Sequence, residues 1–181
     1  MRMPAKKRIS KRTPAADFLE VRKSGVHGRG VYTTAPIRKG TRIIEYTGAH
    51  LPWKEAMDLP PHDPDDPYHT FFFSLENGDV IDAGQGGNEA RWINHACDPN
   101  CETNEEDDRI FVYALRSLRE GDELFYDYKI VPAERRTKAL EKHYVCLCGS
   151  KKCRGSMLEP KPPKKKKRRL SNIRRPRAVA G

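Results

Sequence analysis

The sequence predicts a mostly β domain. Short runs rich in β-branched and aromatic residues recur about every ten residues, and clusters of glycine, proline, asparagine and aspartate separate them. Neither a long amphipathic helix nor a run of about 20 apolar residues is present, so we expect no membrane span. With 181 residues, the chain is long enough for one domain with a substantial core but not comfortably for two.

Each expected strand combines β-branched or aromatic residues with a turn signal at its end. Before Asn94, the apolar run 91–93 reads in the same way, and Asp98-Pro99-Asn100 then forms a turn. The other expected strands are 18–22, 31–33, 41–47, 68–75, 80–83, 109–115 and 123–128.

The remaining segments read as turns, loops and short helices. Residues 50–68 are rich in proline and acids, which favours a short insertion with one helical turn at 53–57 rather than a packed element. Residues 102–108 read as an acidic loop, and 132–142 have the character of a short helix.

The charge of the chain is divided unevenly. Residues 1–14 and 160–181 hold sixteen of the 35 basic residues and none of the 25 acids, which leaves nineteen bases and a net charge of −6 between them. An acidic body can attract a basic peptide, and basic arms can bind nucleic acid or only aid solubility. We expect disordered arms at 1–16 and 160–181, a main domain at 17–130 and a cysteine-bearing segment at 131–159.

The most specific stretch is Arg91 to Cys101, with Gly87-Asn88 before it. It resembles the Gly-Asn-x-x-Arg-x-x-Asn-His-x-Cys-x-Pro-Asn signature of SET-domain protein lysine methyltransferases. The resemblance extends over roughly residues 18–157. It implies a fold of several small sheets with a knot-like C-terminal crossing, a post-SET zinc segment, and methyl transfer from S-adenosylmethionine to lysine.

Glycines at 25, 28 and 30 allow positive φ and let a ligand lie close to the backbone, although a plain hairpin turn would use them equally well. The loop is similar to the cofactor loop of the family. Phe71 differs from the family pattern, because a cofactor-side tyrosine is often found there. The resemblance implies a cofactor site made by His27, Gly28, Arg29, Gly30, Phe71, Asn94, His95 and Leu147.

Three tyrosines are candidates for the chemical step. Period-two alternation places Tyr126 and Tyr128 on one face of the strand 123–128. By resemblance, Tyr128 is the tyrosine that ends the Glu-Leu-x-x-Asp-Tyr motif. Tyr46 resembles a tyrosine lining the lysine channel, and Tyr126 lies where the family limits the number of methyl groups added.

Five cysteines are present, and Cys146, Cys148 and Cys153 lie within eight positions, which favours a metal site over disulfides. A closed tetrahedral zinc site needs a fourth ligand. His143 is one candidate from the sequence, and unpaired structural cysteines are another reading. The resemblance instead implies Cys97, with one structural Zn²⁺ and Cys101 left as a buried thiol.

The function that the resemblance implies is methylation of lysine in a basic protein, such as a histone or a histone-like nucleoid protein. A catalytically silent module that binds basic peptides and nucleic acid is the alternative, and a zinc-containing nucleic-acid binder without cofactor is a third. We expect an intracellular monomer. The basic tail is typical of a nuclear import signal, whether the source is eukaryotic or the protein is injected into a host, but a bacterial protein could use it on the nucleoid.

Overall fold

A computed structural model describes residues 15–66 and 68–161. The expected arms at 1–16 and 160–181 therefore lie almost wholly outside the described residues. The strands and helices follow one another along the chain as η1 (Ala15–Phe18), β1 (Leu19–Lys23), β2 (Arg29–Thr33), β3 (Arg42–Tyr46), β4 (Ala49–Pro52), α1 (Trp53–Met57), β5 (Phe72–Ser74), β6 (Asp79–Asp82), η2 (Glu89–Trp92), β7 (Asn94–His95), β8 (Cys101–Glu106), β9 (Arg109–Ala114), β10 (Phe125–Tyr126) and α2 (Lys138–His143).

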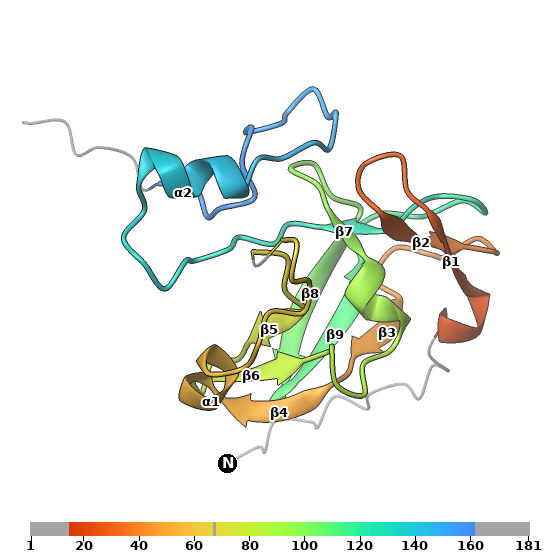
Figure 1. Ribbon diagram of the computed structural model, residues 1–181. Coiled ribbons are helices and arrows are strands. Elements are labelled where there is room, and N and C mark those ends of the chain that lie inside the picture. The colour runs from red at the N-terminus through yellow and green to blue at the C-terminus, as the bar shows by residue number, and fades with distance from the viewer. Residues whose placement is uncertain (1–14, 67, 162–181) are drawn as a thin grey trace, which may run out of the picture.

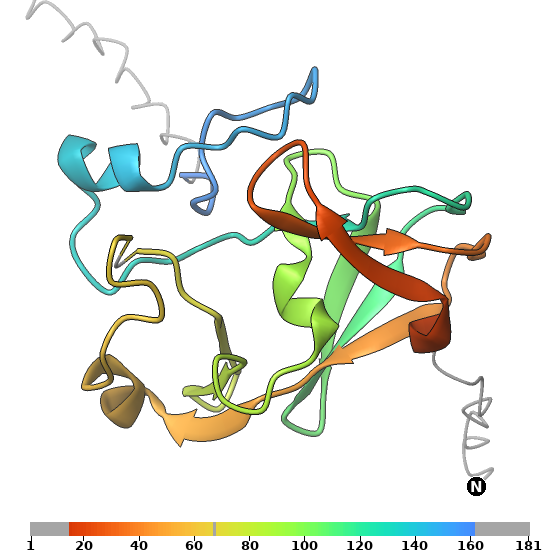
Figure 2. The same cartoon turned by 45° about the vertical axis from the view of Figure 1, so that its right-hand side comes forward.

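The described strands form four small sheets, which confirms the mostly β prediction. β1 pairs with β2, β3-β9-β8 and β4-β6-β5 are three-stranded, and β10 pairs with β7 in parallel. The parallel pair joins Phe125 to Asn94 and Tyr126 to His95, so two motifs thirty residues apart in the sequence become neighbours. α2 and the chain that follows it lie at the end of the molecule that holds β7 and the β1–β2 loop, away from α1 and β4 (Figures 1 and 2).

The sheets meet around one core of β-branched and leucine side chains. Ile43, Ile93, Ile110 and Leu124 are almost fully buried there. Burying a side chain of this kind contributes roughly 1.5–3 kcal/mol, so the core stabilises the arrangement of sheets rather than any single short strand. None of the helices in the described part of the chain combines the length and the apolar character needed to cross a bilayer.

Several expected element boundaries are wrong. Residues 89–92 form the 3₁₀ helix η2 rather than a strand, because the Asn88 side chain accepts a hydrogen bond from Ala90 N and caps it. The acidic loop expected at 102–108 is mostly the edge strand β8, which pairs with β9. Ala15 and Ala16, which fall in the expected arm 1–16, belong to the 3₁₀ helix η1, and Ala15 is buried.

The insertion at 50–68 is also more ordered than the sequence suggests. β4 pairs with β6 along its whole length, and α1 follows at the predicted position 53–57 with Ala56 buried. Beyond α1, His62 Nε2 donates to the fully buried Asp82 carboxylate at 2.7 Å, which ties the insertion to the core. The description of this segment as unpacked is therefore wrong.

Candidate functional site

Asn94 joins β7 to the loop between β1 and β2. Its side-chain amide donates to the backbone carbonyl of Arg29 at 2.7 Å and lies 3.2 Å from the carbonyl of His27 and 3.1 Å from Glu123 Oε1. Because Asn94 is buried, these contacts are shielded from water and fix the loop against the strand. The predicted glycine loop and the predicted Asn-His pair thus form one structure.

Two glycines allow the β1–β2 loop to lie close to Asn94 and Glu123. Gly28 has a φ of +45°, a left-handed conformation that favours glycine. Gly30 lies against Glu123, and a Cβ at this position would overlap the Glu123 carboxylate. Glu123 was not named from the sequence, although it stands three residues before Tyr126 in the same motif.

A cavity of about 130 Å³ opens beside Asn94. It is lined by His27, Gly28, Arg29, His69, Arg91, Trp92, Asn94 and Tyr128. The Nε atom of Arg91 is buried, and the described part of the chain offers it no hydrogen-bond partner. An unsatisfied buried donor beside a cavity fits a polar ligand. His69, Arg91 and Trp92 were not identified from the sequence as site residues.

His95 connects the cavity to the segment after β10. Its Nδ1 accepts a hydrogen bond from Tyr128 N at 3.1 Å, while its Nε2 lies 3.4 Å from Cys97 Sγ. Burial lowers the pKa of His95 to about 4, so the imidazole is neutral at pH 7 and Nδ1 is free to accept. Asp127, next to Tyr128, forms two 2.8 Å hydrogen bonds with Arg154 and so ties the cysteine-bearing segment to the site.

The three predicted tyrosines lie together. Tyr126 and Tyr128 have ring centroids 4.9 Å apart, as their shared strand face predicted, and Phe73 lies 5.4 Å from Tyr46 and 6.1 Å from Tyr126. The hydroxyl of Tyr46 donates to Phe71 O and that of Tyr128 to Ile93 O, both at 2.8 Å. Burial raises the pKa of all three hydroxyls, so they stay protonated. Phe73 was missed, because one phenylalanine in an aromatic strand carries no distinguishing signal.

Four of the five cysteines also come together. The sulfur atoms of Cys97, Cys146, Cys148 and Cys153 all lie within 4.8 Å of one another, and this cluster can hold a metal ion. Sulfurs about 2.3 Å from one zinc would stand roughly 3.8 Å apart, so a small contraction suffices. The fifth, Cys101, is fully buried elsewhere, and burial raises the pKa of its thiol to about 12.

Not every predicted residue faces the cavity. His143 is outside the sulfur cluster, because its ring stacks on Tyr68 with centroids 4.0 Å apart. Leu147 is 64 % exposed and is not among the described residues that line the cavity. Gly30, Phe71 and His95 are also absent from that lining. Phe71 supports it by packing against His69 and Trp92 at centroid distances of 5.1 Å, and His95 adjoins it through its hydrogen bond with Tyr128 N.

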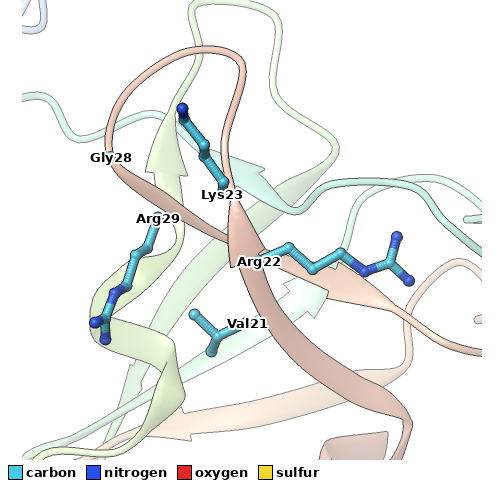
Figure 3. Close-up of a pocket in the computed structure, with 5 residues that line it drawn as sticks. All are labelled: Val21, Arg22, Lys23, Gly28 and Arg29. Atoms are coloured by element: carbon cyan, nitrogen blue, oxygen red, sulfur yellow. The ribbon is translucent and has the colours of Figure 1, made fainter.

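A larger hollow, of about 460 Å³, lies on the β1–β2 hairpin. It is lined by Val21, Arg22, Lys23, Gly28 and Arg29, and Figure 3 shows that the three basic side chains point in different directions. Side chains that diverge cannot hold one small ligand between them. The smaller cavity at Asn94 is therefore the better candidate for the functional site.

Comparison with known proteins identifies the family. Residues 28–129 match the SET domain, and the chain belongs to the SET-domain family. The match begins at the glycine loop and ends just after Tyr128, so it encloses both Asn94 and the tyrosine cluster.

Three curated relatives illustrate what the chain is similar to. It is 36 % identical over 148 residues to "Histone-lysine N-methyltransferase trithorax" of Drosophila melanogaster, covering 76 % of this chain and 4 % of that protein. It is 36 % identical over 138 residues to "Histone-lysine N-methyltransferase 2B" of Homo sapiens, covering 74 % and 5 %. It is 36 % identical over 142 residues to "Histone-lysine N-methyltransferase, H3 lysine-4 specific" of Candida albicans, covering 74 % and 13 %. The chain thus spans only a small part of the length of these relatives.

Proposed function

We propose that the chain is a protein-lysine N-methyltransferase that uses S-adenosylmethionine. The observation that carries the proposal is the convergence of Asn94, the glycine loop and the Tyr128 cluster on one cavity. The relatives named histone-lysine N-methyltransferases support the same activity. We extend the proposal to a basic protein substrate, such as a histone, and to a role at chromatin, since the body between the arms carries a net charge of −6.

The residues account for the needs of the reaction. When bound, S-adenosylmethionine supplies an activated methyl group on a sulfonium sulfur. A lysine amine has a pKa near 10.4 and must lose its proton before it can attack. Tyr46, Phe73, Tyr126 and Tyr128 lie together. Desolvation of the amine among them, next to the positive sulfonium of the bound cofactor, would disfavour the charged ammonium, and the hydroxyl oxygens would orient the amine. Catalysis would then rest on positioning, with no covalent intermediate.

The cavity lining suits one portion of this cofactor. Its lining includes Arg29 and Arg91, the amide of Asn94 and the indole of Trp92, which together offer donors and an aromatic face to an amino-acid and adenosine ligand. We assign His27, Gly28, Arg29, Gly30, Asn94 and His95 to cofactor binding. Leu147 remains a candidate that would contact the ligand through its backbone. Phe71 remains a candidate that would act through the lining residues it packs against.

We further propose that the four-cysteine cluster holds one structural Zn²⁺. Cys97→Ser should lose the ion as fully as Cys148→Ser, because each removes one of four sulfurs from a tetrahedral site. Metal analysis of the purified protein should give about one zinc per chain for the wild type and close to none for either variant.

Cys101→Ser is the matched control, because Cys101 lies outside the sulfur cluster, and this variant should keep the metal. Retention of zinc by Cys97→Ser, or its loss in His143→Ala, would contradict the ligand set.

Tyr126 should control the number of methyl groups added. The described residues provide no hydrogen-bond partner for its hydroxyl, so this hydroxyl can hold a water or the amine where an added methyl group would need space. We expect mainly mono- or dimethyllysine from the wild type and a shift toward more methyl groups in Tyr126→Phe. Mass spectrometry of the modified substrate measures this. Abundant trimethyllysine from the wild type, unchanged in the variant, would contradict this role for Tyr126.

The experiment that tests the proposed function combines cofactor binding with methyl labelling. The purified chain should bind S-adenosylmethionine in a calorimeter and should transfer its labelled methyl group to at least one member of a panel of histones and other basic proteins. Binding of basic protein without any labelling would favour the catalytically silent module instead.

A further inference from the structure

The cavity beside Asn94 has a one-sided charge. Its lining includes the cationic side chains of Arg29 and Arg91 and the imidazole rings of His27 and His69, and none of the residues that line it is an aspartate or glutamate. A small cavity with basic walls favours the anionic part of a ligand. In S-adenosylmethionine the only anionic group is the carboxylate of the methionine portion, since the sulfonium and the amino group are positive.

The two arginines of this lining are oriented by contacts within the protein, although the buried Nε of Arg91 has no hydrogen-bond partner among the described residues. The guanidinium carbon of Arg29 lies 4.9 Å from the centroid of the Trp92 ring, and that of Arg91 lies 5.0 Å from the same centroid. Arg91 also donates from Nη1 to the backbone carbonyl of Ala83 at 3.0 Å. Both guanidinium groups are therefore held in place by contacts within the protein.

His69 is held differently. Its ring meets His27 edge-on at a centroid distance of 5.3 Å and Phe71 at 5.1 Å, and its backbone N–H donates to Asp66 O at 2.9 Å. Within residues 15–66 and 68–161 no hydrogen-bond partner is found for either ring nitrogen. Burial, together with the nearby His27, lowers the pKa of His69, so the ring is neutral at pH 7 with one N–H donor and one acceptor.

The position of His69 in the chain adds to the argument. It is the member of the lining that comes from the segment between α1 and β5, whereas the others come from the β1–β2 loop, from η2 and β7, and from the segment after β10. Phe71, two residues later, fills the space behind it with an apolar ring and has no side-chain donor. His69 is thus the polar side chain that this segment contributes to the site.

We propose that His69 is a further cofactor-binding residue, whose ring N–H donates to the carboxylate of S-adenosylmethionine. The inference rests on the proposed function, because it assigns one group of that cofactor to one residue. A hydrogen bond to a charged group contributes more than a neutral one, so its loss should be measurable in the affinity.

The test compares two ligands that differ only in the carboxylate. Calorimetry with S-adenosylmethionine and with decarboxylated S-adenosylmethionine is done on the wild type, His69→Ala and His69→Gln. We expect His69→Ala to lower the affinity for S-adenosylmethionine by at least about tenfold and to leave the affinity for the decarboxylated ligand unchanged. His69→Gln, whose amide can donate, should restore most of the affinity.

His50→Ala is the matched control, because His50 is exposed on β4 and does not line the cavity; it should bind both ligands as the wild type does. Equal losses for both ligands in His69→Ala would overturn the proposal by showing a merely structural role, and so would unchanged affinity for both. A wild-type chain that binds neither ligand would instead refute the proposed function, and the assignment of His69 with it.

Discussion

Asn94→Ala should weaken the binding of S-adenosylmethionine by at least about a hundredfold, or roughly 2.7 kcal/mol. The Asn94 amide holds the carbonyls of His27 and Arg29 and faces Glu123, so its removal frees the loop that forms one wall of the cavity. It also removes the donor of three part-buried hydrogen bonds, each of which typically contributes about 0.5–1.5 kcal/mol. Calorimetric titration of the cofactor measures the effect.

Asn104→Ala is the matched control for this prediction, because Asn104 is an exposed asparagine on β8. It should bind the cofactor as the wild type does. Far-UV circular dichroism should be nearly the same for both variants, since Asn94 stabilises a loop rather than a sheet. Wild-type affinity in a folded Asn94→Ala variant would exclude this residue from the cofactor site.

Tyr128→Phe should lower turnover by at least about tenfold, roughly 1.4 kcal/mol of barrier, while cofactor affinity changes little. The substitution keeps the ring that packs against Tyr126 and His95 but removes the hydroxyl proposed to orient the amine. The same hydroxyl donates to Ile93 O, so a loss of about 1 kcal/mol in stability is also expected. Turnover should therefore be measured well below the unfolding temperature of the variant.

Tyr113→Phe controls for the loss of a tyrosine hydroxyl in general. Tyr113 lies on β9, and its hydroxyl pairs with Glu106 and Arg42, away from the tyrosine cluster. This variant should turn over normally. If Tyr128→Phe is as active as Tyr113→Phe, Tyr128 has no part in the chemical step.

The fold class was predictable from the sequence because most strands carry β-branched residues between clear turn signals. The strand β8 was not predictable from its sequence, Cys-Glu-Thr-Asn-Glu-Glu. It is an edge strand of the sheet β3-β9-β8 and pairs on one side only, so it tolerates many polar and charged residues. β4 was hidden by the prolines around it, yet Pro52 lies at the end of an edge strand, where its missing N–H does no harm.

The site was predictable to the extent that its residues lie in recognisable motifs. Asn94, His95 and Tyr128 stand in such motifs, and the structure brings them together through the parallel pairing of β7 with β10. The sequence offers no motif that marks His69 or Phe73 as a site residue, and Glu123 stands in the motif that Tyr128 ends but was not named from it. No local pattern distinguishes a histidine or phenylalanine in such a segment from one with another role.

The measurement that tests the central claim most directly is identification of the modified atom. A histone substrate is incubated with the full chain and with S-adenosylmethionine carrying a labelled methyl group, and tandem mass spectrometry then locates the label. We predict label on a lysine side-chain nitrogen, with at least about tenfold less from Tyr128→Phe at equal cofactor occupancy. Label on another residue type, or none on any basic protein from a chain that binds the cofactor, would contradict lysine methylation by this site.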